Sequence, residues 1–333
     1  MNERQLQEAI ARLPKSIEPP HDLWPGIEAR LRRSGGGRPW WQWAVPLAAA
    51  AGLVAVLLGR AGPAAWDVTR LAGRPLLDSM PLSASGRLRV GDWVQTDDSS
   101  RALIAVGRIG QVEVKPKTRL QLVAARASDH RLALARGAID AKVDAVPRLF
   151  FVETPAGTAI DLGCAYTLET DSLGNGRLHV TGGEVEFQTG VRSARVPLGA
   201  VLLTRPEIGP GTPYAEDAPA AFVRTLVRFD FERGKGGAGE ARRLRDVLAL
   251  ARAQDAISLW HVLQRVDSSR RGAVYDRLAT FIAPPPGVTR AAAVRLDSRA
   301  LESYWTAIHR IHFRRIVLKG VREIDPRTGT TAR

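Results

Sequence analysis

Short runs of alternating apolar and polar residues fill the middle of the chain, from about residue 82 to residue 205. Side chains along a β-strand point alternately to opposite faces, so this alternation is typical of strands with one buried face. Gly, Asp, Asn and Pro separate the runs, and Asn175-Gly176 is a strong hairpin signal. No stretch in this region has the pattern of a crossover helix, which argues against a doubly wound sheet. The pattern predicts an all-β domain over residues 82–205.

Apolar residues recur at helical spacing farther along the chain, over residues 239–320. Asp255, Thr289 and Asp297 stand where side-chain caps are expected at helix starts. The predicted helical stripes are Leu244, Val247, Leu248 and Ala251; Ile257, Trp260, Leu263 and Val266; Val274, Leu278, Phe281 and Ile282; and Leu301, Trp305, Ile308 and Ile311. We expect a helical domain here, with a Pro/Gly-rich linker before it at residues 206–238 and a disordered tail after it at residues 321–333.

A long apolar run lies near the N-terminus. Between Trp40 and Gly59 the only polar side chain is Gln42. About 20 helical residues cross a hydrocarbon core of ~30 Å, so the run predicts a single transmembrane helix over residues 40–60. Trp40, Trp41 and Trp43 gather at one end, where indole rings act as anchors at the membrane interface. A cleaved signal peptide is the alternative, but residues 1–39 make a leader that is too long for one.

Residues 1–39 form a short tail with two predicted helical segments. The second carries an apolar stripe of Leu23, Trp24, Ile27 and Leu31. A tail of this length cannot bury the stripe in a core of its own, so the stripe predicts a partner-binding surface. The alternative is an amphipathic helix that lies on the membrane beside the predicted span. Arginines on both sides of the span favour a cytoplasmic N-terminus only slightly.

The formal net charge is +14, from 48 Lys and Arg against 34 Asp and Glu. The arginines are spread over the whole chain and no nucleic-acid-reading motif is present, so we expect a basic surface and no nucleic-acid partner. No catalytic motif, paired-carboxylate signature or metal-ligand spacing is found, which predicts a protein that is not an enzyme and carries no cofactor and no metal. His309 and His312 lie one helical turn apart among arginines, and we expect them on an exposed basic face.

Several stretches of the β-rich region, in order, resemble the FecR-domain family. They are "VGDWVQTDDSSRALIAVGRIGQVEVKPKTRLQL", "LALARGAIDAKV", "FFVETPAGTAIDLGCAYTLE" and "GRLHVTGGEVEF". The resemblance covers roughly residues 85–205 and implies an all-β solenoid or roll of short strands that lies outside the cytoplasmic membrane. It also implies an ECF-type sigma factor as the partner of the N-terminal tail, and a protein or glycan ligand in the envelope. The tail is shorter than is usual in the family, and the C-terminal region does not resemble the family's signalling-partner module.

Cys164 is the only cysteine, which excludes an internal disulfide. Strand alternation places Cys164 on the same face as Tyr166 and Leu168. No other Cys and no His lies nearby in sequence to activate the thiol, so Cys164 and Tyr166 are expected to be structural core residues.

Together these patterns predict a multi-domain protein with a helical tail, a single transmembrane helix, a FecR-like β-domain and a C-terminal α-helical domain. The expected location is the inner membrane, with a single pass, a cytoplasmic N-terminus and the bulk of the chain in the periplasm. The expected function is signal transduction, with a sensing or binding domain outside and a sigma factor controlled inside. The alternative is an envelope ligand-binding or assembly module with no transcriptional role.

Overall fold

The computed structural model describes residues 65–232 and 237–322, with side chains described as far as residue 316. The tail at residues 1–39 and the predicted span at residues 40–60 lie outside the described residues. Where the chain is described, no helix is both long enough and apolar enough to cross a membrane. The described residues belong to one compact unit.

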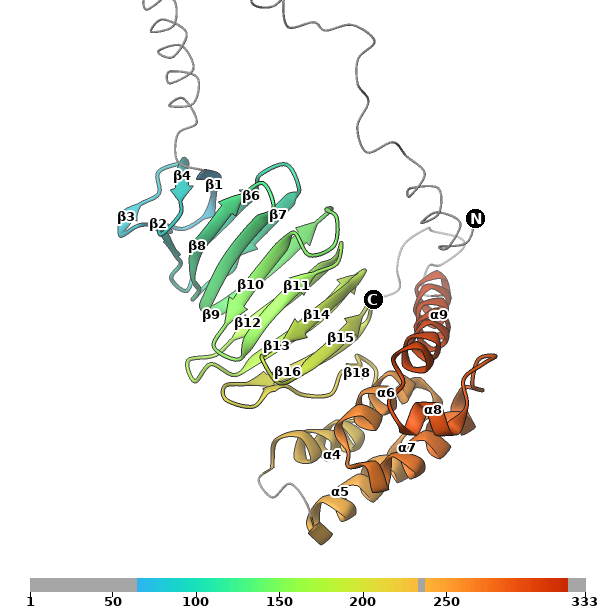
Figure 1. Ribbon diagram of the computed structural model, residues 1–333. Coiled ribbons are helices and arrows are strands. Elements are labelled where there is room, and N and C mark those ends of the chain that lie inside the picture. Colours follow the sequence, from blue (N-terminus) through green and yellow to red (C-terminus); the bar gives the residue numbers. More distant parts are fainter. Residues whose placement is uncertain (1–64, 233–236, 323–333) are drawn as a thin grey trace, which may run out of the picture. The chain divides into compact units, whose positions relative to one another are not determined.

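Two β-sheets make up the first part of the described chain (Figure 1). The strands of the first sheet are β1 (Ala65–Ala72), β4 (Ser85–Arg89), β6 (Arg101–Val106), β7 (Gly110–Val114), β12 (Ala165–Thr170), β13 (Gly176–Gly182), β16 (Ala200–Arg205), β17 (Gly209–Pro210) and β18 (Tyr214–Ala215). Those of the second sheet are β2 (Leu76–Leu77), β3 (Met80–Pro81), β5 (Trp93–Gln95), β8 (Arg119–Arg126), β10 (Phe150–Thr154), β11 (Gly157–Asp161), β14 (Glu184–Gln188) and β15 (Ser193–Pro197).

Strand β9 (Asp129–Val143) belongs to both sheets. Its first half pairs with β8 in the second sheet, and its second half pairs with β12 in the first. Gly137 lies at the change-over with a φ of 96°, a conformation that L side chains rarely adopt. A Cβ atom at this position would lie 2.3 Å from the Cα of Thr118. Glycine therefore allows one long strand to pass from one sheet into the other.

The prediction of a solenoid or roll is wrong. Among the described strands, β9 and β10 are the one parallel pair, and the other pairings are antiparallel. A solenoid stacks similar repeats that each contact only their neighbours, whereas these strands form two sheets joined through β9. The reason for the error is physical: alternation in the sequence reports which face of a strand is buried, but not which strand lies beside it.

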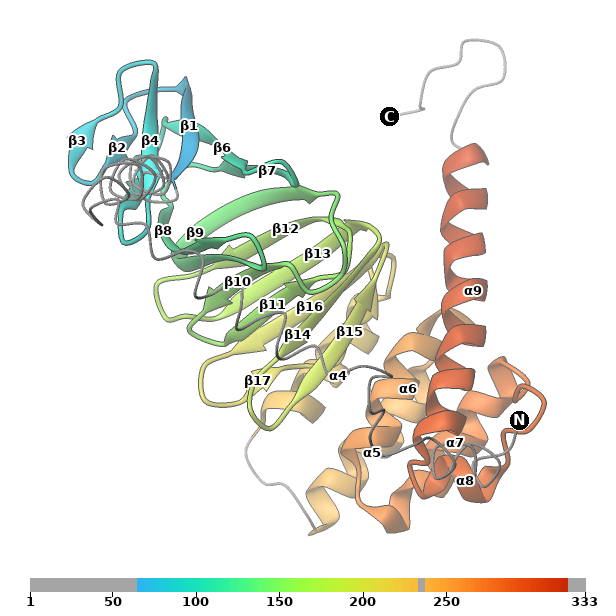
Figure 2. The ribbon, with the colours of Figure 1, turned by 45° about the horizontal axis from the view of Figure 1, so that its top comes forward.

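Helices follow the sheets (Figure 2). They are α4 (Ala220–Phe231), α5 (Gly237–Leu250), the 3₁₀ turn η1 (Ala253–Asp255), α6 (Ala256–Arg265), α7 (Ser268–Phe281), α8 (Arg290–Val294) and α9 (Ser298–Arg322). Helix α4 lies inside the range predicted as a linker, and β1 to β3 precede residue 82, where the β-domain was predicted to begin. Thr289 caps α8 by accepting from the Ala292 N–H, and Asp297 accepts from Ala300 at the start of α9.

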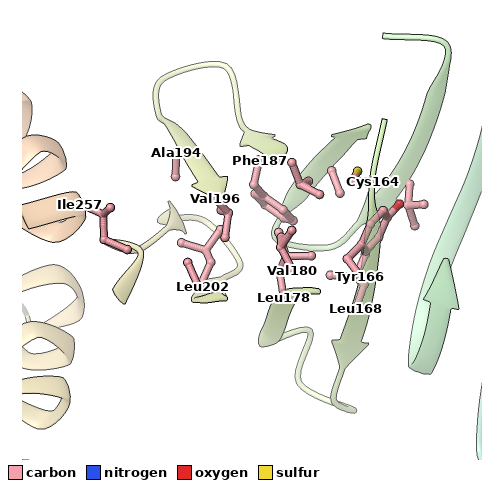
Figure 3. Close-up of a cluster of buried hydrophobic side chains, with 14 of the residues drawn as sticks. Cys164, Tyr166, Leu168, Leu178, Val180, Phe187, Ala194, Val196, Leu202 and Ile257 are labelled. Atoms are coloured by element: carbon pink, nitrogen blue, oxygen red, sulfur yellow. The ribbon is translucent and has the colours of Figure 1, made fainter. Parts of the chain in front are cut away.

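One hydrophobic core continues from the sheets into the helices. Alternate residues of the strands point into it, so the burial pattern of β12 runs strictly between half-buried and buried positions. Figure 3 shows the core from Cys164 and Tyr166 through Val196 and Leu202 to Ile257, which α6 contributes. The sheets and helices therefore share buried apolar surface, which fixes α6 against the sheet.

Candidate binding cleft

Helix α6 contacts the backbone of β15, the last strand of the second sheet, through its side chains. The backbone N–H of Arg195 in β15 donates to Nε2 of His261 at 3.0 Å, and Nδ1 of His261 lies 2.7 Å from the Ile257 carbonyl oxygen. Since Nε2 accepts, the ring proton is on Nδ1, which donates to Ile257, and the imidazole is neutral. Burial, together with the charges of Arg265 and Arg195, lowers the pKa of His261 to about 3. Both ring nitrogens are thus used to hold the strand to the helix.

Arg265, one turn farther along α6, is a buried cation held by several acceptors. Its Nη1 donates to Oδ1 of Asp230 at 3.0 Å and to Oγ1 of Thr212 at 2.8 Å, and its Nη2 donates to the Gly211 carbonyl at 2.8 Å. Oδ2 of Asp230 accepts from the Thr212 N–H at 2.6 Å. The side chains of Arg265 and Asp230 are only 10% and 3% exposed, so each charge is stabilised by the other in place of water. Burial lowers the pKa of Arg265, partly offset by Asp230.

Arg195 connects β15 to two other elements through its side chain. Its Nε donates to Glu184 of β14 at 2.6 Å, and its Nη1 donates to Glu302 of α9 at 2.8 Å. The guanidinium carbon also lies 4.9 Å from the ring centre of Trp305, a cation–π contact. Burial opposes the charge, but the two carboxylates outweigh it and raise the pKa of Arg195.

A cleft of about 270 Å³ lies between β15 and α6. Its lining residues are Glu186, Val191, Arg192, Ser193, Ala194, Arg195, Trp260, His261, Gln264 and Arg265. Arg192 closes the four-residue turn that joins β14 to β15, where the Thr189 N–H donates to the Arg192 carbonyl at 2.8 Å. Its guanidinium reaches the Pro210 carbonyl at 3.5 Å and forms no ion pair with any described residue. Val191, beside it in the turn, is 88% exposed.

Cys164 is buried and lies next to a carboxylate. Its Sγ lies 2.7 Å from Oδ2 of Asp161, while Oδ1 of Asp161 accepts from the Gly163 N–H at 2.6 Å. Burial raises the pKa of the thiol and the charge of Asp161 raises it further, so the thiol stays protonated and donates to the carboxylate. Burial also raises the pKa of Asp161. This arrangement suppresses the thiolate and therefore suits a structural cysteine rather than a nucleophile.

The structure differs from the sequence interpretation at His312. This residue is 5% exposed, and its Nε2 lies 2.8 Å from the Leu198 carbonyl oxygen, so the expectation of an exposed basic face is wrong there. His309 lies 3.6 Å from Glu184 instead. Within the described ranges, no three His, Cys, Asp or Glu residues are grouped so that they could hold a metal ion.

The residues singled out in the sequence fall into two sets. Cys164 and Tyr166 lie in the core, 5% and 2% exposed. The proposed partner stripe Leu23, Trp24, Ile27 and Leu31 and the interface anchors Trp40, Trp41 and Trp43 lie outside the described residues.

Sequence reasoning missed the cleft. Arg192 and Arg195 are close in sequence, but Arg265 comes from a distant segment, and the arginines spread over every segment hide the three that converge. It also missed Asp161, although the sequence "DLGC" places that carboxylate three residues before the thiol.

Comparison with known proteins gives a weak likeness to solved structures. No family model matches the chain, and no curated protein matches it. Two crystal structures of a "putative anti-sigma factor" from Parabacteroides distasonis ATCC 8503 are similar at 14% identity, with TM-scores of 0.34 and 0.33. Each match covers 41% of this chain and 64% of the other, so this chain spans less than two thirds of that protein. The likeness is therefore weak and partial.

Proposed function

We propose that this chain is a regulatory signal-transduction protein whose folded part is a binding module, not an enzyme, with its binding site in the cleft between β15 and α6. The observation that carries the proposal is the construction of the cleft: strand and helix residues surround a half-buried arginine, Arg192, that has no ion-pair partner among the described residues. Binding sites are typically concave, with a few converging polar groups on a preformed scaffold.

The walls of the cleft favour binding over catalysis. A general base or nucleophile needs a free lone pair in the cleft, with a pKa matched to its task. His261 is the histidine of the cleft, and both of its nitrogens are engaged with backbone groups. Arg195 and Arg265 are held by carboxylates and serve to fix the walls.

The finer parts of the proposal rest on the amino-acid sequence. We place the bulk of the chain on the extracytoplasmic side of the inner membrane, and we assign to residues 1–39 the control of an ECF-type sigma factor through Leu23, Trp24, Ile27 and Leu31. The FecR-like stretches and the order of tail, apolar run and β-rich region support this assignment. The second candidate is an envelope ligand-binding or assembly module with no transcriptional role, and the largely exposed Val191 at the mouth of the cleft favours contact with another protein.

A bulky substitution in the cleft tests the binding role. Ser193 lines the cleft and is exposed, so Ser193→Trp fills the cleft without disturbing the core. In host cells that lack the gene, transcripts are compared after complementation with the wild-type chain, with Ser193→Trp, or with the matched control Ser128→Trp. Ser128 is an exposed serine in the turn between β8 and β9. We expect Ser193→Trp to change the regulated transcripts and Ser128→Trp to behave as wild type.

Two results would count against the proposal. If deletion changes transcription but Ser193→Trp behaves as wild type, the cleft has no part in signalling. If deletion of the gene leaves transcription unchanged, the envelope module is the better description. Capture of a sigma factor by residues 1–39, lost on substitution of Trp24 and Ile27 by Ala, would eliminate that second candidate.

A further inference from the structure

Three guanidinium groups converge on the cleft between β15 and α6, and they differ in how their charges are balanced. Arg195 is paired with Glu184 and Glu302, and Arg265 is paired with Asp230. Arg192 is the exception, since the hydrogen bond of its guanidinium, to the Pro210 carbonyl, is a long one of 3.5 Å to a neutral acceptor. The carboxylate of Glu186, which also lines the cleft, is held by Arg148. The cleft therefore contains one cation whose charge the described residues leave without an ion-pair partner.

The guanidinium groups of the cleft shift the pKa of buried neighbours toward the uncharged form. The charges of Arg265 and Arg195 both lower the pKa of His261, in addition to its burial. Burial lowers the pKa of Arg265, and the charge of Arg192 lowers it further, because a nearby like charge disfavours the charged form. Bringing like charges together at a half-buried site costs free energy, and an anion bound to Arg192 would reduce that cost.

The shape of the cleft limits the kind of ligand that fits. An added β-strand is excluded at Arg195, because the outward N–H of this residue is already bonded to His261. A volume of about 270 Å³ accommodates a small oxyanion or one acidic side chain with its neighbours. Ser193 and Gln264 supply further polar groups at the wall.

We infer that the cleft binds a ligand through a carboxylate or phosphate group that pairs with the Arg192 guanidinium. A guanidinium presents a planar fork of donors that matches the two oxygens of either group, and such charge-assisted pairs are among the strongest hydrogen bonds in proteins. The inference rests on the proposed binding role and names the chemistry that the ligand must carry.

Calorimetric titration of the purified full-length chain tests the inference, with inorganic phosphate, succinate and a capped tetraglutamate peptide as probes. We expect binding of at least one probe, weakened by added salt because the pairing is ionic. Arg192→Ala should weaken that binding by about tenfold or more, the loss typical of a hydrogen-bonded charged pair. Arg192→Lys should weaken it less, since it keeps the charge but loses the fork. The matched control is Arg108→Ala, an exposed arginine in the turn between β6 and β7.

The outcomes separate the inference from the proposed function. Binding of phosphate or succinate supports a free anion as ligand, and binding of tetraglutamate alone supports an acidic segment of a protein. The inference is overturned if no probe binds the wild-type chain at millimolar concentration, or if Arg192→Ala binds as tightly as Arg108→Ala. Should transcription still respond to Ser193→Trp in that case, the proposed binding role stands and only the ligand chemistry is refuted. Unchanged thermal unfolding of Arg192→Ala confirms that a loss of binding is not a loss of folding.

Discussion

The buried pair of Asp230 and Arg265 gives the sharpest test of how the sheets and helices are joined. Asp230 belongs to α4, Arg265 to α6, and both bond to Thr212 in the segment between β17 and β18. The substitution Asp230→Asn keeps the shape of the side chain but removes its charge. It leaves the Arg265 guanidinium, 10% exposed, without a counter-ion.

The expected cost follows from the burial of the two groups. Removing one partner of a buried ion pair typically costs about 3–5 kcal/mol, because the remaining charge is desolvated without compensation. Arg265 keeps its hydrogen bonds to Gly211 and Thr212, so we expect the lower end of that range, about 3 kcal/mol. Adding Arg265→Met to Asp230→Asn removes the unpaired guanidinium charge. The double variant should therefore lose less stability than the sum of the losses of the two single variants.

Urea unfolding of the full-length chain, followed by far-UV circular dichroism, measures these differences. The matched control is Asp276→Asn, which breaks the pair with Arg290 in which both side chains are 56% exposed. An exposed pair contributes about 0–1 kcal/mol, so the control should change the unfolding free energy little. If Asp230→Asn is no more destabilising than Asp276→Asn, the reasoning about the junction is refuted.

Two further predictions concern the core and the helix contact. Cys164→Ser keeps a donor for Asp161 and should change the free energy of unfolding little. Cys164→Ala leaves the Oδ2 acceptor of Asp161 unpaired and should lower the free energy of unfolding, measured in urea, by about 1–3 kcal/mol. Equal stability of the two variants would contradict this reasoning. The pKa of His261 is lower in the folded state than in the unfolded state, so the stability that neutral His261 contributes is fully present above about pH 6.5 and is lost as the pH falls toward 3. The free energy of unfolding should fall by up to about 1.4 kcal/mol per pH unit in this range. The pKa of His312 is also lowered, so His312 adds to the loss of stability in acid. In His261→Gln the free energy of unfolding should therefore fall less steeply with decreasing pH than in the wild type. An equal slope would show that His261 is not a buried, neutral imidazole.

The hairpin at Asn175-Gly176 shows what local sequence patterns can and cannot predict. A hairpin does join β12 and β13, as the dipeptide predicted. Its turn is built differently, however: Oδ1 of Asp171 accepts from the N–H groups of Leu173 and Asn175, and Gly174 takes the positive φ of 82°. Gly176 already belongs to β13. The short-range signal indicated the reversal of the chain, while a side chain four residues earlier decides the geometry.

The helical region shows the same limit at longer range. Apolar spacing predicted the stripe of α9, and Trp305 and Ile308 are buried, but Ile311 in the same stripe is 51% exposed. Asp255 was expected to cap α6, yet its carboxylate accepts instead from the backbone and side chain of Arg252. Periodicity describes one helix in isolation, whereas burial and capping depend on what the fold places beside it. The cleft could not be predicted at all, since its walls meet only through tertiary contacts.

The contacts between α6 and β15 also determine whether a strand from another molecule can pair with the edge of the second sheet. The outermost strand of a sheet carries unpaired backbone groups that recruit strands from other molecules. Here the outward N–H of Arg195 is taken by His261, the Ser193 carbonyl is approached by Arg265 at 3.4 Å, and Pro197 has no N–H to offer. His261 and Arg265 of α6 therefore occupy the backbone groups that an added strand would need. The same two side chains line the cleft, so the residues that shape the cleft also oppose self-association at this edge of the sheet.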